Sequence, residues 1–150
     1  MMNKNWLAMA VQEGTPLYVY DTAVVQQNAR AYHTPHGHAH YAVKANNNLH
    51  LLRLIQQAGL GADVTSGGEL FLALEAGFDP AHIIFSGVGK TADEIRMALA
   101  NGIQAIHAES ADEVGLIENT AVDMNRVAPI GLRLNPNISA ETHPYISTGL

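Results

Sequence analysis

Three ionisable residues, Lys44, Asp63 and Arg133, lie directly after or within short apolar runs of the sequence. Burial of a lysine favours its neutral amine, because a charged ammonium is costly to remove from water. A neutral lysine amine can form a Schiff base with an aldehyde cofactor. A buried arginine requires a carboxylate or phosphate partner. We therefore interpret Lys44 as a cofactor-binding nucleophile, Asp63 as a partner that orients it, and Arg133 as a contact of Asp63 or the cofactor.

Simple structural roles explain the same three residues without a cofactor. Lys44 can reach solvent from the end of a strand, which is the more common position of such lysines. Asp63 can cap a strand end, and Arg133 can form an ion pair at the rim of a sheet. The residues alone leave these alternatives open, and they support the rim and buried explanations of Arg133 equally.

Other polar positions are weaker candidates for chemistry. Ser66-Gly67-Gly68 at a helix start can cradle a phosphate, but helix capping alone explains this short pattern. His38 and His40 share one face of a predicted strand, yet no carboxylate nearby completes a ligand set, so no metal site is predicted. His107 is expected to be a hydrogen-bonded histidine at a strand end.

The elements that position these residues follow a regular alternation after residue 37. Short apolar runs, which predict strands, span residues 38–44, 61–65, 83–86, 103–108 and 127–135. Segments with helical spacing of apolar residues span 49–58, 68–76, 91–100 and 111–121. Ser or Thr followed three residues later by Glu marks the start of three of these helices, and glycine follows three of them.

Strands that alternate with helices predict a parallel sheet in the α/β class. An open doubly wound sheet and a (β/α)8 TIM barrel both fit, but no G-x-G-x-x-G follows the first strand, which disfavours a dinucleotide-binding sheet. In a barrel, chemistry lies at the carboxyl ends of the strands, where Lys44, Asp63 and Arg133 stand. A barrel needs about 250 residues, so 150 residues predict a partial barrel of about five βα units in a fragment.

The first 36 residues do not follow this alternation. Residues 15–21 predict a strand and residues 22–32 predict a helix capped by Asp21. No neighbouring segment supplies a sheet partner for that strand.

Composition narrows the class of partners. The net charge is -6, with 14 acidic and 8 basic residues. The basic residues form no cluster in the sequence, so a nucleic-acid partner is not predicted. Cysteine is absent, so no disulfide or thiolate site exists. No apolar run approaches the roughly 18 residues of a membrane span. We expect a cytoplasmic protein that binds a small molecule rather than nucleic acid or a membrane.

Six segments, taken in order, resemble the fold-type III pyridoxal 5'-phosphate (PLP) decarboxylases. They are residues 15–21, 41–46, 61–70, 85–91, 133–137 and 143–150. The resemblance implies an alanine-racemase-like, PLP-binding (β/α)8 barrel followed by a β domain. It divides the chain into residues 1–36, whose strand and helix join the β domain, and 37–150, an incomplete barrel.

The resemblance also implies roles for the three ionisable residues. Lys44 matches the Schiff-base lysine, and Asp63 and Arg133 match positions near the cofactor. Residues 143–150 are similar to the branch of the family that decarboxylates meso-2,6-diaminopimelate to L-lysine and carbon dioxide in bacterial lysine synthesis. The implied assembly is a homodimer.

Other functions remain open. A decarboxylase of the same fold can act on ornithine, arginine or a D-amino acid, a lone barrel can carry PLP without catalysis, and a truncated product can lack function. The family's cofactor-stacking histidine, its glycine-rich phosphate loop and most substrate ligands come later than residue 150. We therefore expect the 150-residue chain to be inactive alone.

Overall fold

A five-stranded parallel sheet forms the centre of the computed structural model, which describes residues 5–134. Its strands are β1 (His40–Ala42), β2 (Gly61–Val64), β3 (Ile83–Phe85), β4 (Ala105–Ala108) and β5 (Ile130–Leu132). Each strand pairs in parallel with the next strand along the chain. A doubly wound sheet reverses its strand order at a switch point, whereas this order runs unbroken from β1 to β5. The predicted partial α/β barrel is therefore confirmed.

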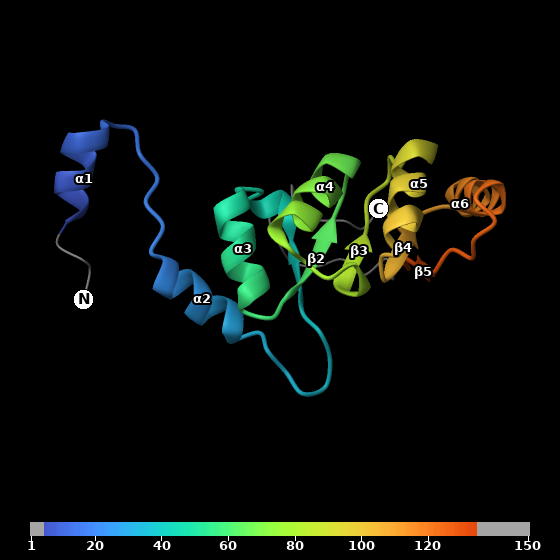
Figure 1. Cartoon of the computed structure of the whole chain (residues 1–150), viewed down its shortest axis with the longest axis horizontal. Helices are drawn as coiled ribbons and strands as arrows, with labels where there is room; N and C mark the ends of the chain where they lie inside the picture. Colours follow the sequence, from blue (N-terminus) through green and yellow to red (C-terminus); the bar gives the residue numbers. More distant parts are fainter. Residues whose placement is uncertain (1–4, 135–150) are drawn as a thin grey trace, which may run out of the picture.

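Four helices connect the strands and lie side by side in chain order (Figure 1). They are α3 (Leu49–Gln57), α4 (Gly67–Ala76), α5 (Ala92–Asn101) and α6 (Ala111–Asp123), with short 3-10 turns η1 (Val43–Ala45) and η2 (Pro80–His82) beside β1 and β3. Ser66, Thr91 and Ser110 cap α4, α5 and α6 through their side-chain oxygens. These are the three helix starts that the Ser/Thr-x-x-Glu patterns predict.

The hydrophobic core lies between the sheet and these helices. Its fully buried large side chains come from both layers: Val43, Leu52, Val64, Leu70, Ile83, Phe85, Ile95, Ile106 and Ile117. Burial of one such side chain contributes about 1.5–3 kcal/mol. This burial fixes the central strands β2, β3 and β4 in place, and with them the polar residues that follow each strand.

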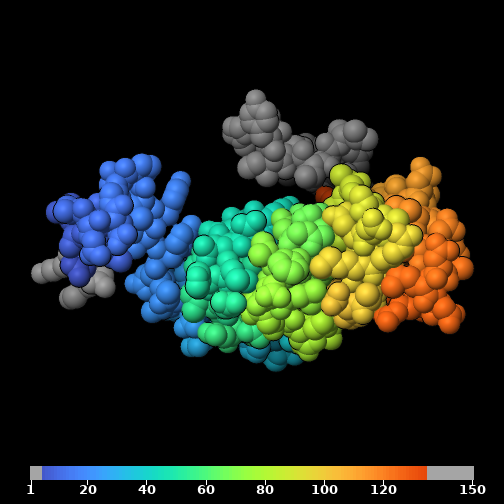
Figure 2. All heavy atoms as spheres, turned by 45° about the horizontal axis from the view of Figure 1, so that its top comes forward, coloured from blue at the N-terminus to red at the C-terminus, as the bar shows by residue number. Residues whose placement is uncertain are grey.

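The amino-terminal segment, residues 5–37, begins at one end of the molecule, where Figure 2 shows its first part in blue, and its last residues loop back below the middle of the molecule toward β1 (Figure 1). It contains α1 (Trp6–Glu13), which has no buried residue, and α2 (Thr22–Arg30), which packs on α3. The carboxylate of Asp21 accepts hydrogen bonds from the first turn of α2, so the predicted cap is confirmed. The sequence patterns did not predict α1.

The predicted strand at residues 15–21 is wrong for this structure. The segment is irregular in the described chain, and it has no strand beside it. A single extended segment leaves its backbone groups without partners, so it forms no strand by itself.

Several predicted elements end earlier in the structure than in the sequence pattern. The strand expected over residues 38–44 is shortened to β1 because the chain turns into η1. The last strand ends at Leu132, and the motif at 143–150 lies outside the described residues. Within residues 5–134, no helix is long and apolar enough to cross a membrane.

Candidate active site

A pocket of about 320 Å³ opens at the carboxyl ends of the strands. Eight residues line it: Lys44, Asp63, Thr65, Ser86, Gly87, His107, Glu109 and Arg133. They come from all five strand ends, because the carboxyl ends of parallel strands meet at one edge. The structure thus brings together Lys44, Asp63 and Arg133, as the barrel interpretation predicts.

Lys44 stands in η1, two residues after the end of β1. Its neighbour Val43 is fully buried in the core, whereas Lys44 itself is exposed and lines the pocket mouth. Of the two positions considered for Lys44, burial and exposure at a strand end, the structure has the exposed one. The 3-10 turn directs the valine into the core and leaves the lysine at the rim, where its amine is accessible.

Asp63 lies on β2, and its Cα pairs in register with Ala42 of β1. Its Oδ1 atom is buried and has no hydrogen-bond partner in the described structure. No ion pair joins it to Lys44 or Arg133 among the described residues. The predicted contacts of Asp63 with these residues are thus absent, and the pocket contains a buried carboxylate oxygen that lacks a donor.

Arg133 follows β5 and binds Glu109 rather than Asp63. Its Nη1 atom lies 3.0 Å from Oε1 and 2.9 Å from Oε2 of Glu109. The Arg133 side chain is 53% exposed. Of the two alternatives that the sequence left open for Arg133, the rim ion pair is the one found, because β5 is the last strand of the described sheet and leaves Arg133 open to solvent.

The pocket wall contains a serine–histidine contact. Ser86 Oγ lies 3.2 Å from His107 Nδ1, so His107 has the hydrogen bond expected of a strand-end histidine. A Cβ atom on Gly131 of β5 would lie 2.5 Å from the His107 ring. Glycine at this position therefore makes room for the imidazole beside β5.

The Ser66-Gly67-Gly68 segment caps the start of α4, and its Gly67 amide is engaged within the protein. Ser66 Oγ accepts from the Glu69 N–H, and the Gly67 N–H donates to Oε1 of Glu94 at 2.7 Å. Hydrogen bonds from the backbone of Gly67 and Thr91 hold the pKa of Glu94 below its ordinary value. The capping explanation of this segment is confirmed.

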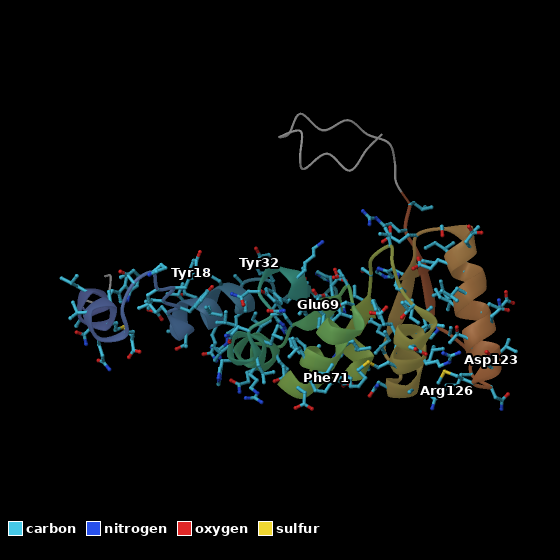
Figure 3. All side chains as sticks on the ribbon, turned by 90° about the horizontal axis from the view of Figure 1, so that it is seen from above. Tyr18, Tyr32, Glu69, Phe71, Asp123 and Arg126 are labelled. Atoms are coloured by element: carbon cyan, nitrogen blue, oxygen red, sulfur yellow. The ribbon has the colours of Figure 1, made fainter. Side chains whose placement is uncertain are left out.

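Glu69 also supports the pocket wall. Its carboxylate accepts hydrogen bonds from the backbone N–H and the hydroxyl of Thr65, at 2.7 and 3.0 Å. In Figure 3, Glu69 lies over the middle of the molecule, whereas Phe71 from the same helix lies at its outer edge. One face of α4 therefore holds the strand end while another faces solvent.

The histidines near the start of the sheet make contacts away from the pocket. The rings of His38 and His82 stack with centroids 4.2 Å apart, and His40 Nε2 lies 3.0 Å from Gln104 Oε1. Within residues 5–134, no group of three or more histidine or carboxylate side chains could hold a metal ion.

Sequence patterns missed one pair beside the pocket, Lys90 and Glu113. Both are buried, and Lys90 Nζ lies 3.0 Å from Glu113 Oε1. Glu113 was predicted only as part of a helix-start pattern, and Lys90 follows a glycine-containing loop that has no apolar run. A lysine after such a loop normally faces solvent, so no local signal indicates its burial.

Comparison with known proteins gives consistent matches. A diaminopimelate decarboxylase of Pseudomonas aeruginosa is 45% identical over 146 residues, which cover 95% of this chain and 35% of that protein. One of Aquifex aeolicus is 42% identical over 91% of this chain and 33% of its own length. The chain thus spans about a third of the length of these curated relatives.

Solved structures agree with the sequence relatives. The crystal structure of diaminopimelate decarboxylase from Helicobacter pylori complexed with L-lysine matches with a TM-score of 0.89 and 42% identity, over 97% of this chain and 38% of that one. A lysine/ornithine decarboxylase from Vibrio vulnificus, complexed with putrescine, matches less well, with a TM-score of 0.73 and 25% identity over 85% and 35%.

The match to a family model covers most of the chain. The model describes the pyridoxal binding domain of pyridoxal-dependent decarboxylases, and it matches residues 22–150. With the strand order and pocket described above, this match shows that the chain belongs to the pyridoxal-dependent decarboxylase family.

Proposed function

We propose that this chain binds PLP through Lys44 and forms part of a diaminopimelate decarboxylase. The reaction converts meso-2,6-diaminopimelate to L-lysine and carbon dioxide. The observation that carries the proposal is the pocket at the strand ends, which combines an accessible lysine amine with an unpartnered carboxylate oxygen in a chain of this family. The higher identity to diaminopimelate decarboxylases than to the lysine/ornithine enzyme supports the substrate.

The chemistry of the pocket residues fits the cofactor. The Lys44 amine is the group that an aldehyde requires, and it lies at the open mouth. The Asp63 Oδ1 atom lacks a donor, which suits a hydrogen-bond donor such as an ammonium as partner. Arg133 places a guanidinium at the rim, where it suits a phosphate or carboxylate. Asp63 and Arg133 are therefore proposed as cofactor-binding residues.

The residues of the chain have distinct tasks in this reaction. When bound, PLP supplies an electron sink for the electrons released as carbon dioxide leaves. Lys44 would hold the cofactor through its aldehyde group, and its exposed position leaves the amine open to the pocket. Asp63 holds a proton donor against Oδ1, and the pocket wall of Ser86 and His107 keeps the binding space in a fixed shape.

The wider organisation follows from the same proposal. Residues 37–150 form the first part of the PLP-binding barrel, and residues 1–36 join a β domain. The complete enzyme is a cytoplasmic homodimer that takes a small amino-acid substrate. The 150-residue chain is inactive alone, and lysine formation by the purified chain would overturn that part of the proposal. A panel of diaminopimelate, ornithine and arginine, given to a longer protein that contains this chain, tests the substrate.

The attachment of PLP to Lys44 has a direct test. The sequence contains three lysines, Lys4, Lys44 and Lys90. A longer protein that contains this chain and the later cofactor ligands is incubated with PLP and borohydride, and peptide mass spectrometry locates the phosphopyridoxyl group. We expect it on Lys44, with Lys44→Ala losing the label and Lys4→Ala, the matched control, retaining it. An equal amount of label in the Lys44→Ala variant would refute the assignment.

A further inference from the structure

The ammonium group of Lys90 is buried beside the proposed PLP site. Lys90 is 7% exposed, and its Nζ lies 5.6 Å from the centre of the Phe85 ring. Nζ donates to the carbonyl oxygen of Gly87 at 2.6 Å, to that of His107 at 2.7 Å and to Oε1 of Glu113 at 3.0 Å. A lysine ammonium has three donors, so all of them are used within the protein.

Glu113 completes this arrangement from the first turn of α6. It is 9% exposed, and while Oε1 binds Lys90, Oε2 accepts the backbone N–H of Glu109 at 2.7 Å. Its own N–H donates to Ser110 Oγ. Both carboxylate oxygens therefore have donors, and the charged pair is fully paired, as a buried pair must be.

The two side chains connect three segments that supply the pocket wall. Lys90 fixes the loop after β3, which contains Ser86 and Gly87, to the end of β4 at His107. Glu113 fixes the backbone of Glu109, whose side chain binds Arg133 after β5. One pair of residues, Lys90 and Glu113, therefore links the pocket-lining segments that follow β3, β4 and β5, although neither residue lines the pocket itself.

We infer that Lys90 and Glu113 are positioning residues that set the geometry of the PLP pocket. The inference rests on the proposed function of that pocket. Gly87 has a backbone φ of +98°, a conformation that side-chain-bearing residues rarely adopt. The bond from Lys90 holds this unusual turn against β4, so Ser86 and His107 stay within hydrogen-bond distance. Replacing both members of a buried ion pair by apolar residues often leaves the stability of a protein unchanged. The effect of the pair on the pocket can therefore be measured apart from its effect on folding.

A double variant separates the effect of the ion pair on the pocket from its effect on folding stability. Lys90→Met alone leaves the Glu113 charge buried without its cation, which lowers the melting temperature. Lys90→Met combined with Glu113→Leu removes both charges, fills similar volume and returns the melting temperature toward the wild-type value. The carbonyls of Gly87 and His107 and the N–H of Glu109 nevertheless lose their partners. We therefore expect recovered stability without a recovered pocket.

Two measurements report the pocket. Hydrogen–deuterium exchange of the cofactor-free chain is expected to be roughly tenfold faster in residues 86–90 and 106–110 of the double variant, the effect of about one hydrogen bond. Borohydride trapping of PLP at Lys44 is expected to need roughly tenfold more PLP for the same reason. The matched control is Asp93→Leu with Arg96→Met, which removes the exposed 2.6 Å pair of α5 and should leave both measurements unchanged.

The outcomes are distinct. Wild-type exchange and wild-type PLP trapping in the double variant would overturn the positioning role while leaving the proposed function intact. Failure of the longer wild-type protein to trap PLP at Lys44 counts against the proposed function, and the exchange measurement still decides the positioning role. If the double variant does not fold, Glu113→Gln replaces it. Its amide keeps the side-chain size, and faster exchange confined to Glu109 is then the supporting result, with unchanged exchange the contradicting one.

Discussion

The repeated βα units and the amino-terminal segment, residues 5–37, differ in how their local signals become structure. In the βα units, capped helices pack on the central strands β2, β3 and β4, which contribute fully buried apolar side chains to the core. The amino-terminal segment carries equally clear signals, including the Asp21 cap of α2, but most of its large apolar side chains are exposed and Ala29 is its one buried residue. Tyr18, labelled near one end of the molecule in Figure 3, is 87% exposed.

This contrast shows that a local sequence pattern forms stable structure only where a neighbouring segment buries its apolar face. Each βα unit buries its apolar face on the units beside it, so hydrophobic burial stabilises what the local pattern begins. The amino-terminal segment packs mainly on α3, through α2, and Tyr20 accepts a hydrogen bond from the Asn46 amide. Residues 15–21 have no sheet beside them in the described chain, and they are irregular.

The largest expected effect is on the free energy of unfolding when a core ring is removed. Phe85 of β3 is fully buried. Phe85→Ala removes its transfer free energy and leaves a cavity, so we expect a loss of about 3–5 kcal/mol. Tyr18→Ala in the amino-terminal segment should change the same quantity by less than about 0.5 kcal/mol. Urea denaturation followed by circular dichroism measures both variants.

Equal losses for these two substitutions would contradict the contrast between the regions. A conservative control is Phe85→Leu, which retains much of the buried volume and should lose less than Phe85→Ala.

Glycine positions give a smaller expected effect. A Cβ atom on Gly61 of β2 would lie 2.5 Å from the His82 carbonyl oxygen and 2.6 Å from the His40 ring. Gly61→Ala therefore forces neighbouring strands apart, at a cost of about 1–3 kcal/mol. A Cβ on Gly37 in the amino-terminal segment meets nothing within 4 Å. Thermal melting should show a clear decrease for Gly61→Ala and little change for Gly37→Ala, and the reverse order would be inconsistent with this packing.

Periodicity and capping patterns predicted the fold more completely than the site. The four helices after residue 37 and the parallel order of the strands follow from local spacing, because each unit packs on the next one. The pocket at the strand ends was also predicted, since parallel strands bring Lys44, Asp63 and Arg133 to one edge. The roles of these three residues toward the cofactor stay predictions.

Partner choice and depth of burial could not be predicted from local patterns. Arg133 binds Glu109 because β5 follows β4 in the sheet, which brings two strand ends together that are 24 residues apart. Lys44 is exposed because the chain turns at η1, and Lys90 is buried because a loop folds back under β4. These outcomes depend on contacts between distant segments, and apolar spacing carries no information about them.

The smallest expected effect concerns two helix starts with similar chemistry in the two regions. Glu94 joins α5 to α4 by accepting the N–H of Gly67 at 2.7 Å and that of Thr91 at 2.9 Å. Asp21 caps only its own helix, α2. Glu94→Gln removes the charge from these bonds, and we expect a loss of about 1 kcal/mol in the free energy of unfolding at neutral pH. Asp21→Asn keeps a favourable cap residue and should change it by a few tenths of a kcal/mol.

The pH dependence of the Glu94 effect has a defined sign. Hydrogen bonds from the backbone of Gly67 and Thr91 lower the pKa of Glu94 in the folded chain, so the folded state binds this proton less readily than the unfolded state. The contribution of Glu94 is therefore complete above the ordinary glutamate pKa and is lost as the pH falls through the lowered value. Urea denaturation at neutral and acidic pH should show the gap between wild type and Glu94→Gln closing on acidification. A gap that widens as the pH falls would contradict the assigned link between α4 and α5.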